Sequence, residues 1–195
     1  WSIHLSDKKM PVIMIVDDEP INISILDNIF ESSYDIKVAT SGARCLSVIE
    51  SGVTPDLFLV DIMMPDLSGY EVLELLKADP TTMNIPVIFV SSNDTQADVA
   101  KGIKLGASDY ITKPVFPDIA IARVSMHLRL KQQSDELRKM ALFDQLTNLY
   151  NRHYLIEAGT QRLSESYRNN SALALIMLDI DNFKHLNDVC LNAYV

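Results

Sequence analysis

The stretch VIMIVDDEPINISILDNIF, residues 12–30, decides the fold. A run that is apolar throughout is followed by two aspartates, a proline and then apolar residues spaced three or four apart. A short, continuous apolar run is typical of a strand that is buried on both faces, and the spacing that follows is typical of an amphipathic helix. The stretch therefore predicts a strand that leads through an acidic turn into a helix.

The same alternation recurs along the chain. Further short runs rich in apolar residues are IKVA, LFLV, VIFV and YIT, at residues 36–39, 57–60, 87–90 and 110–112. Turn-forming residues fall near the predicted breaks between strands and helices: Gly52, Pro55, Gly69, Pro86, Gly102 and Gly106. Strands alternating with amphipathic helices indicate an α/β fold, in which helices cover both faces of a doubly wound, five-stranded parallel sheet.

The pattern changes after Pro117. Residues 118–140 contain no glycine or proline, and they predict one long helix. Apolar residues in it fit a 3.5-residue repeat with one polar interruption, Gln133: Met126, Leu130, Leu137 and Met140. The repeat is consistent with a coiled coil or with a fifth helix that continues into a linker. Beyond it, residues 152–168 predict another helix, and ALALIML at residues 172–178 predicts a strand.

The composition limits the class of protein. With a formal net charge of −9, the 195 residues are a poor match for a nucleic-acid surface, which is basic. No run approaches the about 18 uninterrupted apolar residues of a membrane span, and WSIHLSDKKM at the start lacks the apolar core of a signal peptide. Cys45 and Cys190 have no metal-ligand spacing, which favours free thiols in a reducing compartment. We therefore expect a cytoplasmic protein without nucleic-acid or membrane partners.

Polar side chains follow four of the five predicted strands, at the edge where an open α/β sheet binds its ligands. Asp17 and Asp18 follow the first strand, Asp61 the third, Ser91 the fourth and Lys113 the fifth. Each has an alternative interpretation: the aspartates and the serine could begin or cap helices, and the lysine could be a surface charge. The convergence of all of them on one edge favours a functional site.

Such a cluster has a definite chemistry. Carboxylates about 4 Å apart repel each other by about 4 kcal/mol at an effective dielectric constant of about 20, so the cluster needs a proton or a cation. Solvent-open oxygen ligands favour Mg²⁺, while Lys113 and Ser91 supply donors for an anionic group. This combination is typical of phosphoryl transfer, with Asp61, at the centre, as the nucleophile.

Four motifs in residues 12–117 resemble the receiver domain of two-component response regulators, which has a flavodoxin-like fold. The motifs are IVDDEP, LVDIMMPDLSGYE, VIFVSS and GASDYITKP. The resemblance implies that Asp61 accepts a phosphoryl group from a histidine kinase or a phosphotransfer protein. It also implies that Mg²⁺ or Mn²⁺ binds to Asp17, Asp18, Asp61 and the backbone carbonyl of Met63.

The resemblance implies a switch as well. Ser91 is expected to bond a phosphoryl oxygen, and Lys113, joined to Pro114 by a cis peptide bond, is expected to pair with the phosphoryl group. Tyr110 resembles the aromatic residue that turns inward during activation, with an ordinary core tyrosine as the alternative. We expect phosphorylation to alter homodimer packing through the receiver surface and the long helix.

Two later motifs, FDQLTNLYNRHYL at residues 143–155 and LDIDNFKHLND at residues 178–188, resemble the start of a GGDEF-type diguanylate cyclase domain. Such domains join two GTP molecules into cyclic di-GMP. The implied metal, phosphate and guanine contacts are Asp179, the backbone carbonyl of Ile180, Phe183, Lys184 and Asn187. Alternatively, Asp179 and Asp181 merely end a strand and begin a helix. Leu191 and Asn192 replace the family's glycine and histidine, and the GGDEF signature is absent, so we expect no cyclase activity.

These expectations divide the chain into an N-terminal extension (1–10), a receiver domain (11–122), a helical linker (123–140) and a truncated, incomplete α+β cyclase fragment (141–195). The leading hypothesis is a phosphoryl-accepting response regulator that controls a cyclase output. An alternative is a dimerisation module that modulates an intact cyclase partner. A third, a Mg²⁺-dependent phosphohydrolase built on Asp179, is disfavoured because Phe183 stands where such enzymes place a small hydroxyl or β-branched residue.

Overall fold

The computed structural model describes residues 10–92, 96–179 and 181–182, with the backbone alone at residues 96 and 97. The chain divides into two compact units, Trp1–Arg138 and Lys139–Val195. No helix in the described ranges combines the length and the apolar character that crossing a membrane requires.

The first unit is built on a five-stranded sheet with all strands parallel and in the order β2-β1-β3-β4-β5. The strands are β1 (Val12–Val16), β2 (Asp35–Ala39), β3 (Leu57–Val60), β4 (Val87–Ser91) and β5 (Asp109–Thr112). Each begins and ends within one residue of its predicted bounds, so the strand predictions are confirmed. Every residue of β1, β3 and β4 is buried, because helices cover both faces of the sheet.

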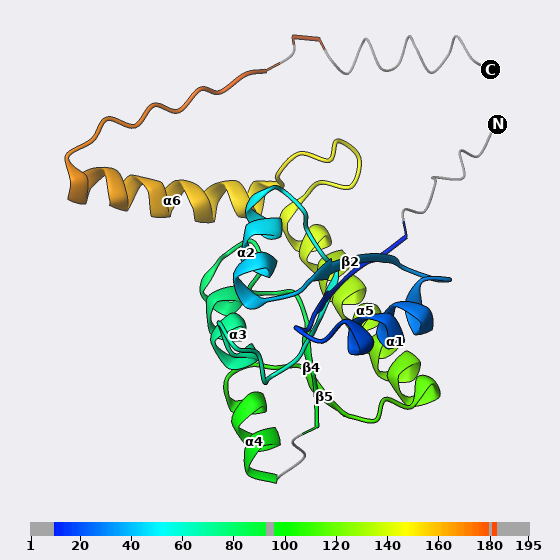
Figure 1. Cartoon of the computed structure of the whole chain (residues 1–195). Coiled ribbons are helices and arrows are strands. Elements are labelled where there is room, and N and C mark those ends of the chain that lie inside the picture. Colours follow the sequence, from blue (N-terminus) through cyan, green and yellow to red (C-terminus); the bar gives the residue numbers. More distant parts are fainter. Residues whose placement is uncertain (1–9, 93–95, 180, 183–195) are drawn as a thin grey trace, which may run out of the picture. The chain divides into compact units, whose positions relative to one another are not determined.

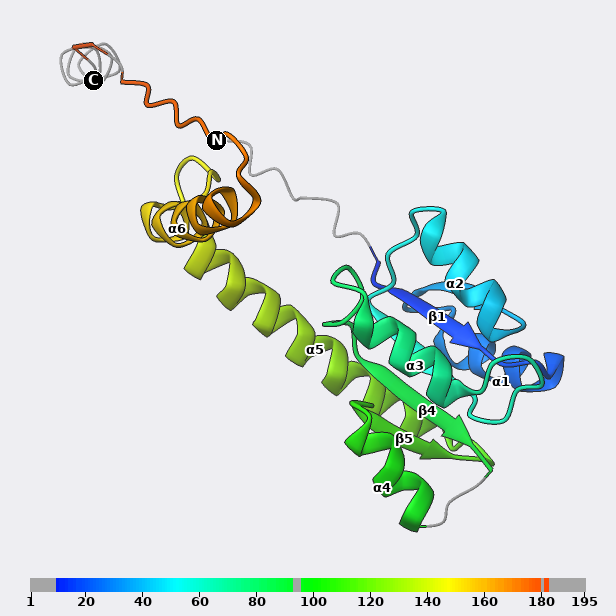
Figure 2. The ribbon, with the colours of Figure 1, turned by 90° about the vertical axis from the view of Figure 1, so that its left-hand side faces the viewer.

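Five helices begin in this unit and cover the sheet on its two faces (Figures 1 and 2). They are α1 (Pro20–Phe30), α2 (Gly42–Glu50), α3 (Gly69–Ala78), α4 (Gln96–Lys104) and α5 (Pro117–Leu142). The apolar residues of α1 and α5 pack on one face, and those of α2, α3 and α4 pack on the other. The predicted doubly wound α/β fold is confirmed.

The order of the strands positions the site. β1 pairs with β2 on one side and with β3 on the other, with Val16 opposite Val60. The chain therefore leaves β1 and β3 at adjacent points of the same edge, where the direction of winding reverses and where ligands bind in such sheets. Asp17 and Asp61 are the first residues after these two strands.

Gly102 differs from its prediction. It lies inside α4 and not at a break between elements. A Cβ atom at this position would lie 3.0 Å from Cε2 of Phe89. The residue is therefore small because the helix lies close to β4, and the sequence signal for a turn was misleading here.

The long helix α5 runs without interruption from Pro117 to Leu142, as predicted, and crosses the boundary expected between residues 122 and 123. Ala120 and Val124 are fully buried in the core beneath it. The four residues of the predicted 3.5-residue repeat are between 48% and 68% exposed: Met126, Leu130, Leu137 and Met140.

The second unit contains helix α6 (Arg152–Asn169), which follows the predicted helical stretch closely. Asn151 caps its first turn by accepting a hydrogen bond from the amide of Tyr154. Asn170 ends it in the left-handed conformation. No side chain of α6 is fully buried.

The predicted strand at residues 172–178 is wrong. Residues 171–179 adopt no regular structure, and Ile176 and Leu178 are 80% and 90% exposed. A strand needs hydrogen bonds from a neighbouring strand, and none of the described residues pairs with this segment. An apolar run without a partner therefore remains outside any sheet.

Candidate functional site

Three aspartates meet at the edge of the sheet. Carboxylate oxygens of Asp17, Asp18 and Asp61 all lie within 4.8 Å of one another. Asp17 is 1% exposed and Asp61 is 7% exposed, whereas Asp18 is half-buried. Parallel pairing of β1 with β3 causes this juxtaposition, since it places residues distant in sequence next to each other.

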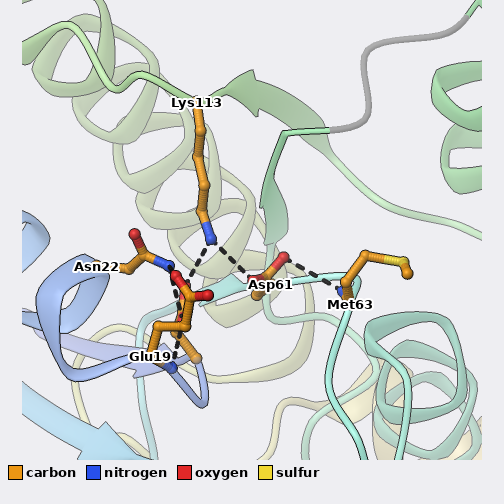
Figure 3. A network of polar contacts seen from close by, with 6 residues as sticks. Glu19, Asn22, Asp61, Met63 and Lys113 are labelled. Carbon is orange, nitrogen blue, oxygen red and sulfur yellow. Dashed lines mark hydrogen bonds and ion pairs between the residues drawn. The ribbon is translucent and has the colours of Figure 1, made fainter.

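Lys113 reaches the cluster from the end of β5. Its Nζ lies 2.9 Å from Oδ2 of Asp17 and 2.8 Å from Oδ2 of Asp61 (Figure 3). The side chain is only 14% exposed, and its backbone amide donates to the carbonyl of Ser91 at 2.9 Å. The Lys113–Pro114 peptide bond is cis, as predicted. The lysine is thus held between two carboxylates, and its surface-charge alternative does not apply.

Asp17 is oriented by the turn into α1. Its Oδ1 accepts hydrogen bonds from the amide of Glu19 at 2.8 Å and from Nδ2 of Asn22 at 3.1 Å (Figure 3). Nδ2 of Asn22 also donates to Oε2 of Glu19 at 2.8 Å. The side chain of the N-cap residue, Glu19, makes no capping hydrogen bond. Asp17 stabilises this turn through Oδ1 and also contacts Lys113 through Oδ2. Asn22 has no motif signal, and sequence reasoning missed it.

Asp61 lies in a loop that packs closely against α3. The amide of Met63 donates to Oδ1 of Asp61 at 3.3 Å, so Met63 lies beside the acid (Figure 3). The role of its carbonyl as a metal ligand stays a prediction. A Cβ at Gly69 would lie 2.3 Å from the carbonyl oxygen of Asp61, a distance that only glycine permits. Ser68, and not Asp61, caps α3 through a reciprocal capping box with Glu71.

The loop after β3 is also tied to α2, a connection with no signal in the motifs. Oδ2 of Asp66 accepts a hydrogen bond from the amide of Ala43 at 3.2 Å. This bond and one from the amide of Leu67, which contributes most, lower the pKa of Asp66. The loop that carries Asp61 therefore contacts α2 as well as α3.

The charges of the cluster do not balance. Burial, with a further contribution from the charge of Asp17, raises the pKa of Asp61 above its ordinary value and outweighs the opposing effect of Lys113. Burial opposes the charge of Lys113, but its hydrogen bonds to Asp17 and Asp61 outweigh burial and raise the pKa of Lys113. Three carboxylates facing one ammonium group leave two negative charges uncompensated. A divalent cation with oxygen ligands fits this donor set.

Ser91 and Tyr110 lie in the neighbouring strands. Ser91, the last residue of β4, is fully buried. Tyr110 lies in β5 opposite Phe89 and is 8% exposed, within the apolar core under α2, α3 and α4. This inward position is shared by an activated switch residue and by an ordinary core tyrosine.

A cavity of about 460 Å³ opens beside Lys113. Its walls come from α1, from the end of β4 and from the segment after β5, and they include Asn22, Ile25, Leu26 and Val115. One side is apolar, while Lys113 and Asn22 connect the cavity with the acidic cluster.

The expected cyclase contacts are only partly described. Asp179 is exposed and lies in no regular element. The other four lie outside the described residues: Ile180, Phe183, Lys184 and Asn187. The second unit therefore presents no assembled site within its described part.

Comparisons with known proteins find a different family in each of two parts of the chain. The family model of the response regulator receiver domain matches residues 13–125, and that of the diguanylate cyclase GGDEF domain matches residues 141–190. A Vibrio cholerae protein named "Probable cyclic di-GMP phosphodiesterase" is 40% identical over 137 residues, which are 70% of this chain and 31% of that protein. Response regulator PleD of Caulobacter vibrioides is 37% identical over 128 residues, which are 65% of this chain and 28% of PleD.

A solved structure supports the same assignment. The BeF3-activated DrrB receiver domain aligns with a TM-score of 0.54 and 30% identity, covering 62% of this chain and 98% of that domain. The chain spans less than a third of the length of the two curated relatives. Its first unit has the strand order, the acidic cluster and the sequence of a receiver domain. The chain belongs to the response regulator receiver family, and its receiver domain is followed by a region that matches the GGDEF domain family.

Proposed function

We propose that this protein is a response regulator that accepts a phosphoryl group on Asp61 in the presence of Mg²⁺ or Mn²⁺. The observation that carries the proposal is the position of Lys113, whose Nζ bonds both Asp17 and Asp61 inside a cluster with excess negative charge. Asp17, Asp18, Asp61 and the carbonyl of Met63 are the proposed metal ligands. When bound, the cation supplies positive charge to the phosphoryl oxygens.

The chain's own groups perform the transfer. A carboxylate oxygen of Asp61 attacks the phosphorus of a phosphohistidine, so that an O–P bond forms, the N–P bond breaks and the released imidazole takes up a proton from solvent. Asp17, held by Glu19 and Asn22, keeps Lys113 directed at the reacting carboxylate. Lys113 then pairs with the new phosphoryl oxygens, and the hydroxyl of Ser91 donates to another of them.

The phosphodonor is a histidine kinase or a phosphotransfer protein, on this proposal. The cavity beside Lys113 gives a donor protein a place to approach Asp61. Ile21 and Ile25 on α1 are 74% and 44% exposed, and Ile25 also lines the cavity. An apolar surface next to a charged site is suited to a transient protein contact.

The output is a diguanylate cyclase, on the strength of the GGDEF match at residues 141–190. The receiver alone does not define the output, because a relative named as a phosphodiesterase is similar over the length of a receiver domain. For residues 1–195 alone we infer no turnover, since the GGDEF signature is not in this sequence. Formation of cyclic di-GMP from GTP by the purified chain would contradict that inference.

Phosphoryl acceptance is tested by intact mass after incubation with acetyl phosphate and Mg²⁺. We expect the wild-type chain to gain the mass of one phosphoryl group and Asp61→Asn to gain none. Asp118→Asn, which changes an exposed aspartate in the first turn of α5, is the matched control and should behave as the wild type. Chelation of the divalent cation should prevent the gain. An unmodified wild type, or a modified Asp61→Asn, would reject the proposal.

A second candidate function is dimerisation through α5, with modulation of an intact cyclase partner. The observation that favours it is the exposure of the 3.5-residue repeat on this helix. The oligomeric mass of the wild type and of Asp61→Asn, with and without phosphodonor, separates the candidates. A phosphorylation-dependent mass supports a switched homodimer, whereas the same dimer in all four samples supports a constitutive module. Mixing with a complete cyclase relative then shows whether turnover changes.

A further inference from the structure

The described side chains of helix α4, at residues 98–104, make few apolar contacts with the receiver core. Among its described side chains, Val99 packs partly buried against the core, and Leu105 does so just beyond the helix. Gly102 lies against the ring of Phe89, while Ile103 remains 49% exposed. A helix held by so few contacts depends strongly on any additional one.

Tyr70, from the first turn of α3, provides such a contact. Its hydroxyl donates to the backbone carbonyl of Asp98 at 3.3 Å, and Nζ of Lys101 lies 4.0 Å from its ring centroid. The same ring meets Phe89 of β4 edge to face, with centroids 5.3 Å apart. The side chain of Tyr70 therefore contacts α4 at two positions about one helical turn apart, Asp98 and Lys101. It also packs against β4 through Phe89.

Tyr70 is also close to the phospho-acceptor through the backbone. It follows Gly69, whose amide donates to the carbonyl of Ile62 at 2.9 Å. Gly69 packs so tightly on the carbonyl of Asp61 that no Cβ fits between them. A displacement of the backbone at Asp61 must therefore displace the first turn of α3, because the contact leaves no free space.

Tyr70 is linked to Tyr110 through one residue, because its ring meets Phe89 and Phe89 lies opposite Tyr110 in the sheet. Burial raises the pKa of Tyr70, and the nearby Asp98 and Tyr110 add to the increase. Both tyrosines border the same apolar core. Tyr70 thus lies between the acceptor loop, α4 and the proposed switch residue.

We propose that Tyr70 is a positioning residue that fixes α4 against α3 and transmits a change at Asp61 to α4 through the contact of Gly69 with the Asp61 backbone. The proposal has two parts. The first, called the tether, is that Tyr70 holds α4 against α3 in the unmodified protein, and it does not depend on phosphorylation. The second, called transmission, is that a change at Asp61 reaches α4 through Tyr70, and it rests on the proposed phosphoryl acceptance at Asp61.

The tether is tested by amide hydrogen exchange of α4 in the full chain. Tyr70→Phe keeps the ring and removes only the hydrogen bond to Asp98, so we expect exchange in α4 to become about fivefold faster. Exchange in β1 should be unchanged, which would show that the core is intact. Tyr34→Phe is the matched control, because Tyr34 contacts Phe30 at an interplanar angle of 67° with ring centroids 5.9 Å apart, away from α4.

Transmission is tested by the same measurement with Mg²⁺ and saturating beryllofluoride, which mimics a phosphoryl group. We expect beryllofluoride to change α4 exchange in the wild type and in Tyr34→Phe. In Tyr70→Phe this response should shrink at least about twofold, while beryllofluoride still binds. Because coupling is reciprocal, its dissociation constant should shift by a similar factor.

The outcomes separate the two halves. Unchanged α4 exchange in ligand-free Tyr70→Phe overturns the tether, and a full beryllofluoride response in that variant overturns transmission. If the wild type does not bind beryllofluoride, the proposed function fails and transmission fails with it, while the ligand-free comparison still decides the tether. Should Tyr70→Phe fold poorly, Lys101→Gln removes the cation–π contact and should accelerate α4 exchange about twofold; no acceleration there overturns the tether.

Discussion

Two apolar runs of this protein have similar composition and opposite surroundings. VIMIV, in β1, lies at most 7% exposed, whereas Leu175, Ile176 and Met177 of ALALIML are between 80% and 87% exposed. β1 has a strand on each side and helices on both faces, while no described residue pairs with the second run. The difference teaches that burial of a strand depends on its neighbours as much as on its own residues.

The largest expected effect comes from truncating one residue in each region. Phe58→Ala, in β3, removes a fully buried ring and should lower the free energy of unfolding by about 3–5 kcal/mol. Ile176→Ala should change it by less than about 0.5 kcal/mol, because the side chain is exposed. Urea unfolding followed by circular dichroism measures both. A large loss for Ile176→Ala would show that the second run is packed in solution.

Glycines in the two regions give the next effect, with opposite signs. In Gly69→Ala the new Cβ meets the backbone of Asp61, so we expect a loss of about 1–3 kcal/mol in unfolding free energy and slower phosphoryl acceptance. At Gly159 in α6 no atom lies within 4 Å of the added Cβ. Gly159→Ala should therefore stabilise the helix by up to about 1 kcal/mol. Unfolding curves of both variants and amide exchange of α6 measure these changes. If both substitutions changed stability in the same direction, the expected contrast between the two positions would be wrong.

A smaller effect is expected at Asp109, which joins β5 to α5. Its carboxylate lies 2.5 Å from Nη1 of Arg123 and 3.2 Å from Nε2 of His127. Burial raises the pKa of Asp109, but these bonds and one from the amide of Tyr110 outweigh burial and lower it. Asp109→Asn should cost about 1 kcal/mol at neutral pH, a modest value because Arg123 is partly exposed to screening solvent.

The sign of that effect follows from linkage. Since folding lowers the pKa of Asp109, the stabilisation is present above the ordinary aspartate value of about 3.9 and is lost as pH falls through the lowered value. Unfolding of the wild type and of Asp109→Asn should thus converge at acidic pH. A difference that persists undiminished below pH about 2 would refute the ion pair as its source.

The smallest expected effect is a difference between the pKa values of two aspartates, Asp61 and Asp144. Burial raises the pKa of Asp61, whereas hydrogen bonds from the amide and hydroxyl of Thr147 lower that of exposed Asp144. Carboxyl carbon NMR should therefore find Asp61 titrating above the ordinary value and Asp144 below it. Because folding raises the pKa of Asp61, stability should fall as pH rises from the ordinary value through the raised one.

The same titration governs function. If Asp61 is the phospho-acceptor, as proposed, only its ionised carboxylate can attack phosphorus. Phosphoryl acceptance should then decline on acidification at a higher pH than an ordinary aspartate would give. Added Mg²⁺ favours the ionised form and should move that decline to lower pH. Acceptance rates measured against pH at two Mg²⁺ concentrations check both statements. A decline that ignores Mg²⁺ would argue against a metal beside Asp61.

Much of the receiver could be predicted because its signals are local. Each strand is a short apolar run, and Asp17, Asp61 and Lys113 each follow such a run directly. The general rule for parallel sheets then places all three residues at one edge. Asn22 and Tyr70 could not be found in this way. Asn22 was selected for its contact with Asp17, and Tyr70 for its contact with α4, and no sequence motif predicts either contact.

The order of apolar and polar residues was enough to predict the α/β class, the five strands of the receiver and the polar residues that follow them, since side-chain periodicity is a property of neighbouring residues. Packing in three dimensions settled which strands adjoin, that Lys113 bonds both Asp17 and Asp61, and that residues 172–178 form no strand. These features depend on distances between parts of the chain that are far apart in sequence. Hydrogen bonds and burial fix such distances, and periodicity carries no information about them.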